Sequence, residues 1–373
     1  MKTRIVLTVG CRPDAIKMMP LYKELKSRKN IQPILLSTGQ QKENLEHIFH
    51  EFSVKPDYDL KIMKKDQSLF DITTNVLTTL QDLLDEIEPD LVLVCGDTSS
   101  AFATALACYY LRIPLGHVEA GLRTGNIYLP YPEEMNRKFI SMVAKYNFAP
   151  TKHAKNNLLK DGVREENIYV TGNTIIDTLP YTVRQDYHHP ELDWVGDDKL
   201  IFITAHRREN IGRPMHNMFR AIRRVLEENK DVKAIYPIHM NEQVRKIAEE
   251  ELGGCDRIHI IEPLEVVDCH NFESLSYLIL TDSGGIQEEA PTLGIPVLVM
   301  KKTTDRPEGV KAGTSKVVGI KESNIYKEFT RLIKNKSAYT KMSKIANPYG
   351  DGHASERIAN ILEEKEYKEY SGQ

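Results

Sequence analysis

The chain has 373 residues, of which 41% are hydrophobic and 28% are charged, and its formal net charge is −3. This composition is typical of a soluble globular protein, and a charge so close to neutral argues against broad binding to nucleic acid or to membrane surfaces. The length exceeds what one hydrophobic core usually serves, so two domains are expected, and no apolar run approaches the roughly 18 residues of a membrane span.

The first half of the chain alternates buried strands with helical patterns. Helical periodicity covers about Leu69 to Glu86, and Thr151 is expected to cap a short helix after a later strand. Strand, helix, strand at this spacing predicts a parallel sheet covered on both faces. The expected strands are Ile5 to Val9, Gln32 to Ser37, Leu91 to Cys95 and Pro114 to Val118.

Two cations lie at the end of the first expected strand. Arg12 and Lys17 flank Pro13, which suits the first turn of a helix. Ligands of open parallel sheets bind at the carboxyl ends of strands, so two cations there favour a phosphate. The alternative is an ordinary solvated helix face.

Three carboxylates follow neighbouring strands. Asp97 and Glu119 come directly after strands, and Glu133 opens the helix after the next loop. Like charges at about 4 Å repel by roughly 1–4 kcal/mol at effective dielectric constants of 80 to 20. Such a cluster raises one pKa and creates a proton donor near neutral pH. Alternatively, each carboxylate caps a helix or pairs with Arg123 or Arg137.

The second half repeats the strand and helix rhythm after a polar crossing expected over Asp186 to Lys199. From about Ala354 to Tyr370 we expect one amphipathic helix, which docks on the first domain. The expected boundaries are 1–185, 186–352 and a terminal helix over 353–373. We therefore expect an α/β fold of two doubly wound domains with the site in the cleft between them. The expected strands are Leu200 to Thr204, Ala234 to Pro237, Ile258 to Ile261, Tyr277 to Leu280 and Pro296 to Met300.

The stretch Thr281 to Pro291 carries the strongest single signal. Gly284 and Gly285 let backbone N–H groups approach an anion, and Ser283 can donate to a phosphate oxygen. Glu288 or Glu289, one turn further on, can accept from ribose hydroxyls. The pattern predicts a seat for a nucleotide diphosphate, and its alternative is a glycine-containing turn that serves packing alone.

Other polar residues at strand ends point the same way. His206 stands beside Arg207 and Arg208, and a loop presents Arg306. Neither half has Gly-x-Gly-x-x-Gly after its first strand, which argues against a tightly held dinucleotide. The five cysteines are scattered without a Cys-x-x-Cys pair, which favours reduced thiols in a cytoplasm and argues against zinc.

In this order, the motifs resemble those of the non-hydrolysing UDP-N-acetylglucosamine 2-epimerases, which have the two-domain GT-B fold. The resemblance spans about residues 5 to 320. The matching segments are Arg12 to Lys17, Gly96 to Thr98, His117 to Thr124, Pro132 to Arg137, Thr171 to Thr174, His206 to Asn210 and Thr281 to Pro291.

The resemblance implies reversible inversion at C2 of UDP-GlcNAc to give UDP-ManNAc, a source of ManNAc for cell-surface polysaccharide. Family members eliminate UDP to give a 2-acetamidoglucal and then add UDP back, without a metal or redox cofactor. The implied partners are the UDP-sugar substrate and a second copy of the chain in a homodimer. The implied catalytic residues are Asp97, Glu119, Glu133 and His206; those implied for substrate binding are Arg12, Lys17, Arg137, Ser283, Gly284, Gly285, Glu289 (the ribose) and Arg306.

The chain departs from the family pattern at three places. Many members have Thr where Cys11 stands, Glu where Asp14 stands, and an aromatic residue where Cys269 stands near the nucleotide base. Two other activities share the nucleotide seat: a GT-B glycosyltransferase and an epimerase of a related UDP-2-acetamido sugar. A regulator that binds a nucleotide sugar without catalysis is a third alternative, against which the three intact carboxylates argue.

The resemblance also implies a second, activating UDP-GlcNAc site in bacterial members. Gln40, Glu133, Arg207 and His239 match its residues. Glu43 replaces a neutral glutamine, and Asp66 falls near an expected arginine, although Lys64 and Lys65 are close. An anion beside a diphosphate weakens binding, so we expect weak activation or none.

Overall fold

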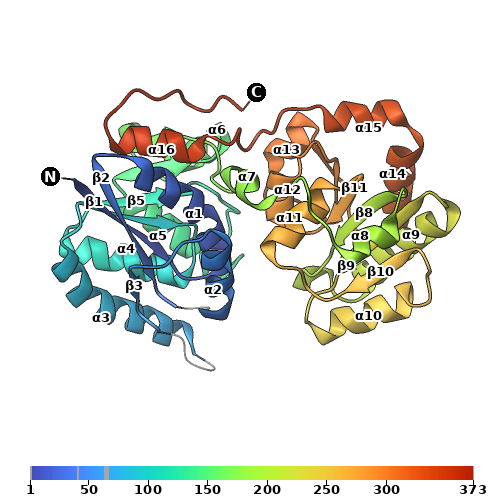
Figure 1. The fold of residues 1–373 in the computed structure, drawn as a ribbon, viewed down its shortest axis with the longest axis horizontal. Helices are drawn as coiled ribbons and strands as arrows, with labels where there is room; N and C mark the ends of the chain where they lie inside the picture. Colours follow the sequence, from blue (N-terminus) through green and yellow to red (C-terminus); the bar gives the residue numbers. More distant parts are fainter. Residues whose placement is uncertain (1, 40–41, 63–66, 373) are drawn as a thin grey trace. The chain divides into compact units, whose positions relative to one another are not determined.

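The computed structural model describes residues 2–39, 42–62 and 67–372, without the side chains of residues 42–44 (Figure 1). The chain divides into two units. Unit 1 comprises Met1–Thr178 with Tyr349–Gly372, and unit 2 comprises Leu179–Pro348. The stretch expected as a crossing, Asp186 to Lys199, lies in unit 2 and contains helix α8.

Unit 1 is built on a parallel sheet with the strand order β3-β2-β1-β4-β5-β6-β7. The order reverses direction between β1 and β4, the kind of position where doubly wound sheets bind ligands. Its strands are β1 (Thr3–Val9), β2 (Ile31–Ser37), β3 (Tyr58–Asp59), β4 (Leu91–Cys95), β5 (Leu115–Val118), β6 (Tyr146–Ala149) and β7 (Ile168–Val170). Its helices are α1 (Arg12–Ser27), α2 (Lys42–Glu51), α3 (Leu69–Ile87), α4 (Ser99–Leu111), α5 (Glu133–Val143), α6 (Lys152–Lys160) and α16 (Ala354–Leu362).

Side chains of the central strands of unit 1 alternate between the two faces of the sheet. Val6 and Val92 pack with α3 and α4 in one core cluster, whereas α1 lies over β1 and β2 outside that cluster. Because both faces are covered, β4 is buried at every position, as the continuous apolar run predicted. Helix α3 begins at the capping box of Ser68 and Asp71, and Thr151 caps α6 as expected.

The C-terminal segment returns to unit 1. Helix α16 packs on α1, and Arg28 donates to Asn360 (2.9 Å) and Glu363 (3.2 Å). The expectation of one helix to Tyr370 is wrong beyond Leu362. The chain turns at Glu364, which has a φ of 56°, and continues without helix until the Tyr370 N–H donates to Val170 O on β7. Burial of Tyr370 stabilises this route.

Unit 2 has a second parallel sheet, with the strand order β10-β9-β8-β11-β12-β13. Its strands are β8 (Lys199–Thr204), β9 (Val232–Pro237), β10 (Ile258–Ile261), β11 (Leu278–Thr281), β12 (Val297–Val299) and β13 (Ser315–Val317). Its helices are α7 (Leu179–Thr182), α8 (Pro190–Val195), α9 (Arg213–Glu228), α10 (Glu242–Leu252), α11 (Val266–Ser274), α12 (Gly284–Glu289), α13 (Pro307–Ala312), α14 (Glu322–Lys334) and α15 (Lys336–Ser343).

The same alternation divides the core of unit 2. Ile201 and Ile203 of β8 pack in the cluster with α9, α10 and α14, whereas Leu200 and Phe202 pack with α8, α11 and α12. Two doubly wound α/β units confirm the expected fold class. Within the described ranges, the structure has no helix long and apolar enough to cross a membrane.

Candidate functional site

The ends of β4 and β5 in unit 1 present two of the expected carboxylates. Lys17 on α1 forms an ion pair with Glu119, with Nζ to Oε1 and Oε2 distances of 2.6 and 2.5 Å. Asn173 Nδ2 donates to Glu119 Oε2 at 3.0 Å. Glu119 itself has a φ of 62°, in a region that costs a non-glycine residue of order 1 kcal/mol. The surrounding contacts hold this carboxylate in a strained backbone position, as is common at functional sites.

Asp97 is the second carboxylate, and Arg137 of α5 forms an ion pair with it. Asn136 fixes the same turn, because its Nδ2 donates to Asp97 O at 2.9 Å. Burial raises the pKa of Asp97; the Arg137 charge opposes this shift and the Glu119 charge adds to it. The pKa is therefore moved toward neutrality, which is what an acid–base group needs.

Glu133 and Glu134 open helix α5 with different environments. Glu133 Oε2 is buried without a hydrogen-bond partner among the described residues. Glu134 is fully buried, accepts from the N–H groups of Thr124 (3.1 Å) and Gly125 (3.2 Å), and lies 3.5 Å from Arg137 Nη1. Glu134 thus fixes the preceding loop through hydrogen bonds. Glu133, by contrast, has a carboxylate oxygen, Oε2, that accepts no hydrogen bond from the described residues.

From the sequence, His117 was named only as part of a motif and was assigned no role. Its Nε2 donates to Gly96 O at 2.7 Å, and its Nδ1 lies 3.1 Å from Ser141 Oγ, which sets the tautomer. Burial lowers the pKa of His117 to about 4. A neutral His117 therefore fixes the turn that carries Asp97, and only the sheet register places it there.

The corner between β1 and α1 is closely packed. A Cβ on Gly10 would lie 2.8 Å from Ser100 Cβ and from Thr38 Oγ1, so only glycine fits. Asp14 accepts from the N–H groups of Gly10 (3.0 Å) and Cys11 (3.3 Å) and from the Cys11 thiol. Burial raises the pKa of both Asp14 and Cys11. These two departures from the family pattern thus form one contact, and Arg12 follows it as the first residue of α1.

Unit 2 organises its strand ends around Asp282, whose side chain is fully buried after β11. It accepts from the N–H groups of His206 (3.1 Å) and Arg207 (3.0 Å) and from Asn210 Nδ2 (3.0 Å). His206 Nδ1 lies 3.5 Å from the same carboxylate. Burial lowers the pKa of His206, Asp282 opposes this, and Arg207 lowers it further. Sequence reasoning missed Asp282, whose partners lie more than 70 residues away.

The turn Ser283-Gly284-Gly285 begins α12. Ser283 N donates to Thr281 Oγ1 at 2.8 Å, and the Ser283 side chain makes no capping hydrogen bond within the described chain. Arg306 pairs with Glu288 and with Asp305 (3.0 Å), and a Cβ on Gly284 would lie 3.6 Å from the Arg306 Cζ. The guanidinium therefore lies beside the glycine turn.

Glu289 is the carboxylate predicted to bind ribose. Its side chain is 10% exposed, and His270 Nε2 of α11 lies 3.7 Å from its Oε2. His270 is oriented in turn by Thr182, whose Oγ1 lies 2.7 Å from Nδ1. Glu288 thus forms an ion pair with Arg306, whereas Glu289 lies beside His270.

Comparison with known proteins identifies the family of the chain. A family model described as UDP-N-acetylglucosamine 2-epimerase matches residues 23–363. The Bacillus subtilis UDP-N-acetylglucosamine 2-epimerase is 53% identical, over 97% of this chain and 95% of its own. The chain belongs to the UDP-N-acetylglucosamine 2-epimerase family.

Solved structures of family members extend the likeness. The S. aureus MnaA–UDP co-structure has a TM-score of 0.90 and 48% identity, covering 97% of this chain and 96% of that one. The Neisseria meningitidis UDP-GlcNAc 2-epimerase bound to UDP-GlcNAc has a TM-score of 0.89 and 43% identity, covering 97% and 100%. The two-domain fold of this epimerase family therefore extends over nearly the whole chain.

The residues matched to the family's activating site are described only in part. The His206 and His239 rings stack 5.6 Å apart, and Arg207 Nε donates to Asp282 O at 3.3 Å. Gln40 and Asp66, with Lys64 and Lys65, lie outside the described residues, as does the side chain of Glu43. His239 and Arg207 are thus together beside His206.

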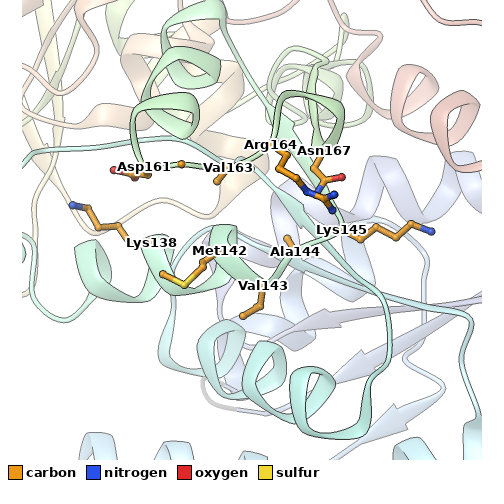
Figure 2. A pocket seen from close by; sticks show the side chains of 10 residues that line it. Lys138, Met142, Val143, Ala144, Lys145, Asp161, Val163, Arg164 and Asn167 are labelled. Carbon is orange, nitrogen blue, oxygen red and sulfur yellow. The ribbon is translucent and has the colours of Figure 1, made fainter.

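A pocket of about 550 Å³ on unit 1 lies apart from the residues predicted for this epimerase chemistry (Figure 2). It is lined by the end of α5 and the loop before β7, including Lys138, Met142 and Arg164. None of the predicted site residues lines it. No group of three or more His, Cys, Asp or Glu side chains in the described ranges is arranged to hold a metal ion.

Proposed function

We propose that this chain interconverts UDP-GlcNAc and UDP-ManNAc by elimination and re-addition of UDP. The observation that carries the proposal is the pair of carboxylates at adjacent strand ends of unit 1, each held by a cation: Glu119 by Lys17 and Asp97 by Arg137. A GT-B glycosyltransferase shares the nucleotide seat but has no need of such a group of carboxylates. Family membership supports the epimerase over that alternative.

The chemistry follows from the substrate. The C2 proton is not acidic, so its direct removal is disfavoured. Loss of UDP from C1 makes removal of the C2 proton easier. The C1–O bond breaks with its electron pair going to the UDP oxygen, the C2 proton passes to a carboxylate, and a C1–C2 double bond remains. Re-addition returns the proton to the other face of C2. Asp97, Glu119 and Glu133 are the proposed acceptors and donors of that proton.

Departure of UDP develops negative charge on the diphosphate, which cations and backbone N–H groups stabilise. In unit 1 we assign this role to Arg12, Lys17 and Arg137. In unit 2 the Ser283-Gly284-Gly285 turn and His206 seat the diphosphate. Arg306 lies beside that turn, and Glu289 accepts from the ribose hydroxyls.

The decisive experiment is incubation of the protein with UDP-GlcNAc in deuterated water. The expected product is UDP-ManNAc with deuterium at C2, detected by NMR. A glycosyltransferase would give sugar transfer to an acceptor without deuterium at C2, and a binding protein would give neither. Absence of deuterium and of epimer would overturn the proposal.

We further propose that the enzyme works as a homodimer and that its product supplies ManNAc for surface polysaccharide. Two-fold dimers are the commonest soluble assemblies. Light scattering should then give about 85 kDa, twice the chain mass of 42.6 kDa. A particle of 42.6 kDa at working concentration would contradict the dimer.

A further inference from the structure

Helix α11 carries a buried carboxyl group that the proposed reaction does not use. Glu273 is 0% exposed. Its Oε1 accepts from the Cys269 thiol, with an Sγ to Oε1 distance of 3.4 Å. Its Oε2 is buried without a partner that donates to it in the part of the chain that the structure describes. A buried oxygen without a donor is expensive for a carboxylate but natural for the O–H of a neutral carboxyl group.

A second carboxyl group lies beside it. The carboxyl groups of Glu273 and Glu289 lie within hydrogen-bonding reach of each other, and a hydrogen bond between two carboxyl groups requires a proton on one of them. Burial raises the pKa of Glu273 well above its ordinary value, the charge of Glu289 raises it further, and the Cys269 hydrogen bond opposes the shift. Because Glu273 is the more deeply buried of the two, it holds the proton and Glu289 keeps the charge.

We propose that Glu273 is a positioning residue, which in its neutral form donates to Glu289 and holds that carboxylate for the ribose hydroxyls of the nucleotide. The inference rests on the proposed function, which seats ribose at Glu289. The roles of the oxygens are consistent: one oxygen of Glu273 accepts from Cys269 and the other donates. His270 approaches Glu289 from the same helix as Glu273.

The arrangement makes nucleotide affinity depend on pH. Among the described residues, the titratable groups that contact the pair include His270 and Cys269 on α11, and the neighbouring Glu288 on α12 forms an ion pair with Arg306. As pH rises through the raised pKa of Glu273, the donor is lost and two buried carboxylates repel each other. Affinity for a ligand with ribose hydroxyls therefore falls on the alkaline side.

The test is isothermal titration of UDP and 2′-deoxy-UDP into the wild type and the Glu273→Gln and Glu273→Ala variants between pH 6 and 9. Glutamine has an N–H donor at every pH, so E273Q should bind UDP within about 3-fold of the wild type and lack its alkaline decline. E273A should bind UDP about 10-fold more weakly, as expected for a lost hydrogen bond to a charged group. Binding of 2′-deoxy-UDP should change less than that of UDP in both variants.

Two controls separate the possible failures. Glu289→Gln should remove the preference for UDP over 2′-deoxy-UDP, and the exposed Glu250→Gln on α10, which also removes one carboxylate, should change nothing. If the wild type does not bind UDP, the proposed function fails. If UDP binds and E289Q behaves as expected, but E273A binds like the wild type or E273Q keeps the alkaline decline, only the role of Glu273 is overturned. Thermal unfolding of each variant verifies folding.

Discussion

The two units place polar side chains at the same kind of position, the carboxyl ends of parallel strands, but they hold them in different ways. In unit 1, the carboxylates of Glu119 and Asp97 are paired with Lys17 and Arg137. In unit 2, the buried carboxylate of Asp282 is satisfied mainly by backbone N–H groups. Ion pairs and donated hydrogen bonds both favour the charged form of a carboxylate, and the backbone hydrogen bonds of Asp282 also fix the conformation of the chain at His206 and Arg207.

We propose that this difference corresponds to two functions, proton transfer in unit 1 and anion binding in unit 2. We propose that unit 1 serves proton transfer, because burial raises the pKa of Asp97 while neighbouring cations favour its charged form. For unit 2 we propose anion binding, because Asp282 holds the chain at His206 and the glycine turn follows directly. Variants in the two units should therefore change different measurable quantities.

The largest expected effect comes from Glu119→Gln in unit 1. We expect turnover of UDP-GlcNAc to fall by at least about 100-fold, the usual scale for an acid–base group. UDP affinity, measured by isothermal titration, should stay within a few fold, because Glu119 is not among the residues proposed to bind the nucleotide. Asp97→Asn should behave in the same way. Near-normal turnover in both variants would contradict the proposal that the carboxylates of unit 1 transfer the proton.

The second prediction concerns His117, whose pKa is lowered to about 4 by burial. The unfolded chain then binds a proton below an ordinary histidine pKa of about 6.5, while the folded chain does not until about pH 4. Stability is therefore lost as pH falls through this window, by about 3 kcal/mol in total.

Thermal unfolding between pH 4 and 7 checks this value. His117→Gln keeps a donor toward Gly96 but does not titrate, so its melting temperature should fall less on acidification than that of the wild type. The exposed His153→Gln in the same unit is the matched control and should follow the wild type. Equal acid slopes for wild type and H117Q would show that His117 is not held neutral.

The third prediction perturbs unit 2. His206→Ala should weaken UDP binding by about 10-fold, the worth of one hydrogen bond to a charged group. The exposed His188→Ala, in the same unit, should bind UDP like the wild type. If calorimetry shows unchanged affinity and turnover is also normal, the diphosphate does not lie at His206.

The smallest effect is expected from added UDP-GlcNAc when the reaction starts from pure UDP-ManNAc. Glu43 and Asp66 replace residues expected at the family's activating site, so conversion should begin without a long lag. The measurement is a progress curve with and without micromolar UDP-GlcNAc. A long lag that the additive abolishes would show that the activating site works despite these two anions.

Much of the fold could be read from local patterns. Leu91 to Cys95 was predicted with the residues that β4 has, and Ile258 to Ile261 with those of β10. Burial on both faces of a parallel strand requires a continuous apolar run, so a few adjacent residues identify it. The C-terminal helix was predicted too long, because its end depends on the burial of Tyr370 rather than on helical periodicity.

The sequence by itself determined the two doubly wound units, the family and the set of polar residues at strand ends. Only the tertiary structure decided which side chains meet, because partners such as Lys17 and Glu119 are 102 residues apart and no local pattern records their contact. The tertiary structure also showed that Glu134 accepts hydrogen bonds from the preceding loop, whereas Glu133 Oε2 is buried without a partner among the described residues. It placed Asp282 where the N–H groups of His206 and Arg207 donate to it. It also joined Glu273 to Glu289, since only the packing of α11 beside α12 brings two carboxyl groups into one dry site, where one of them must keep its proton.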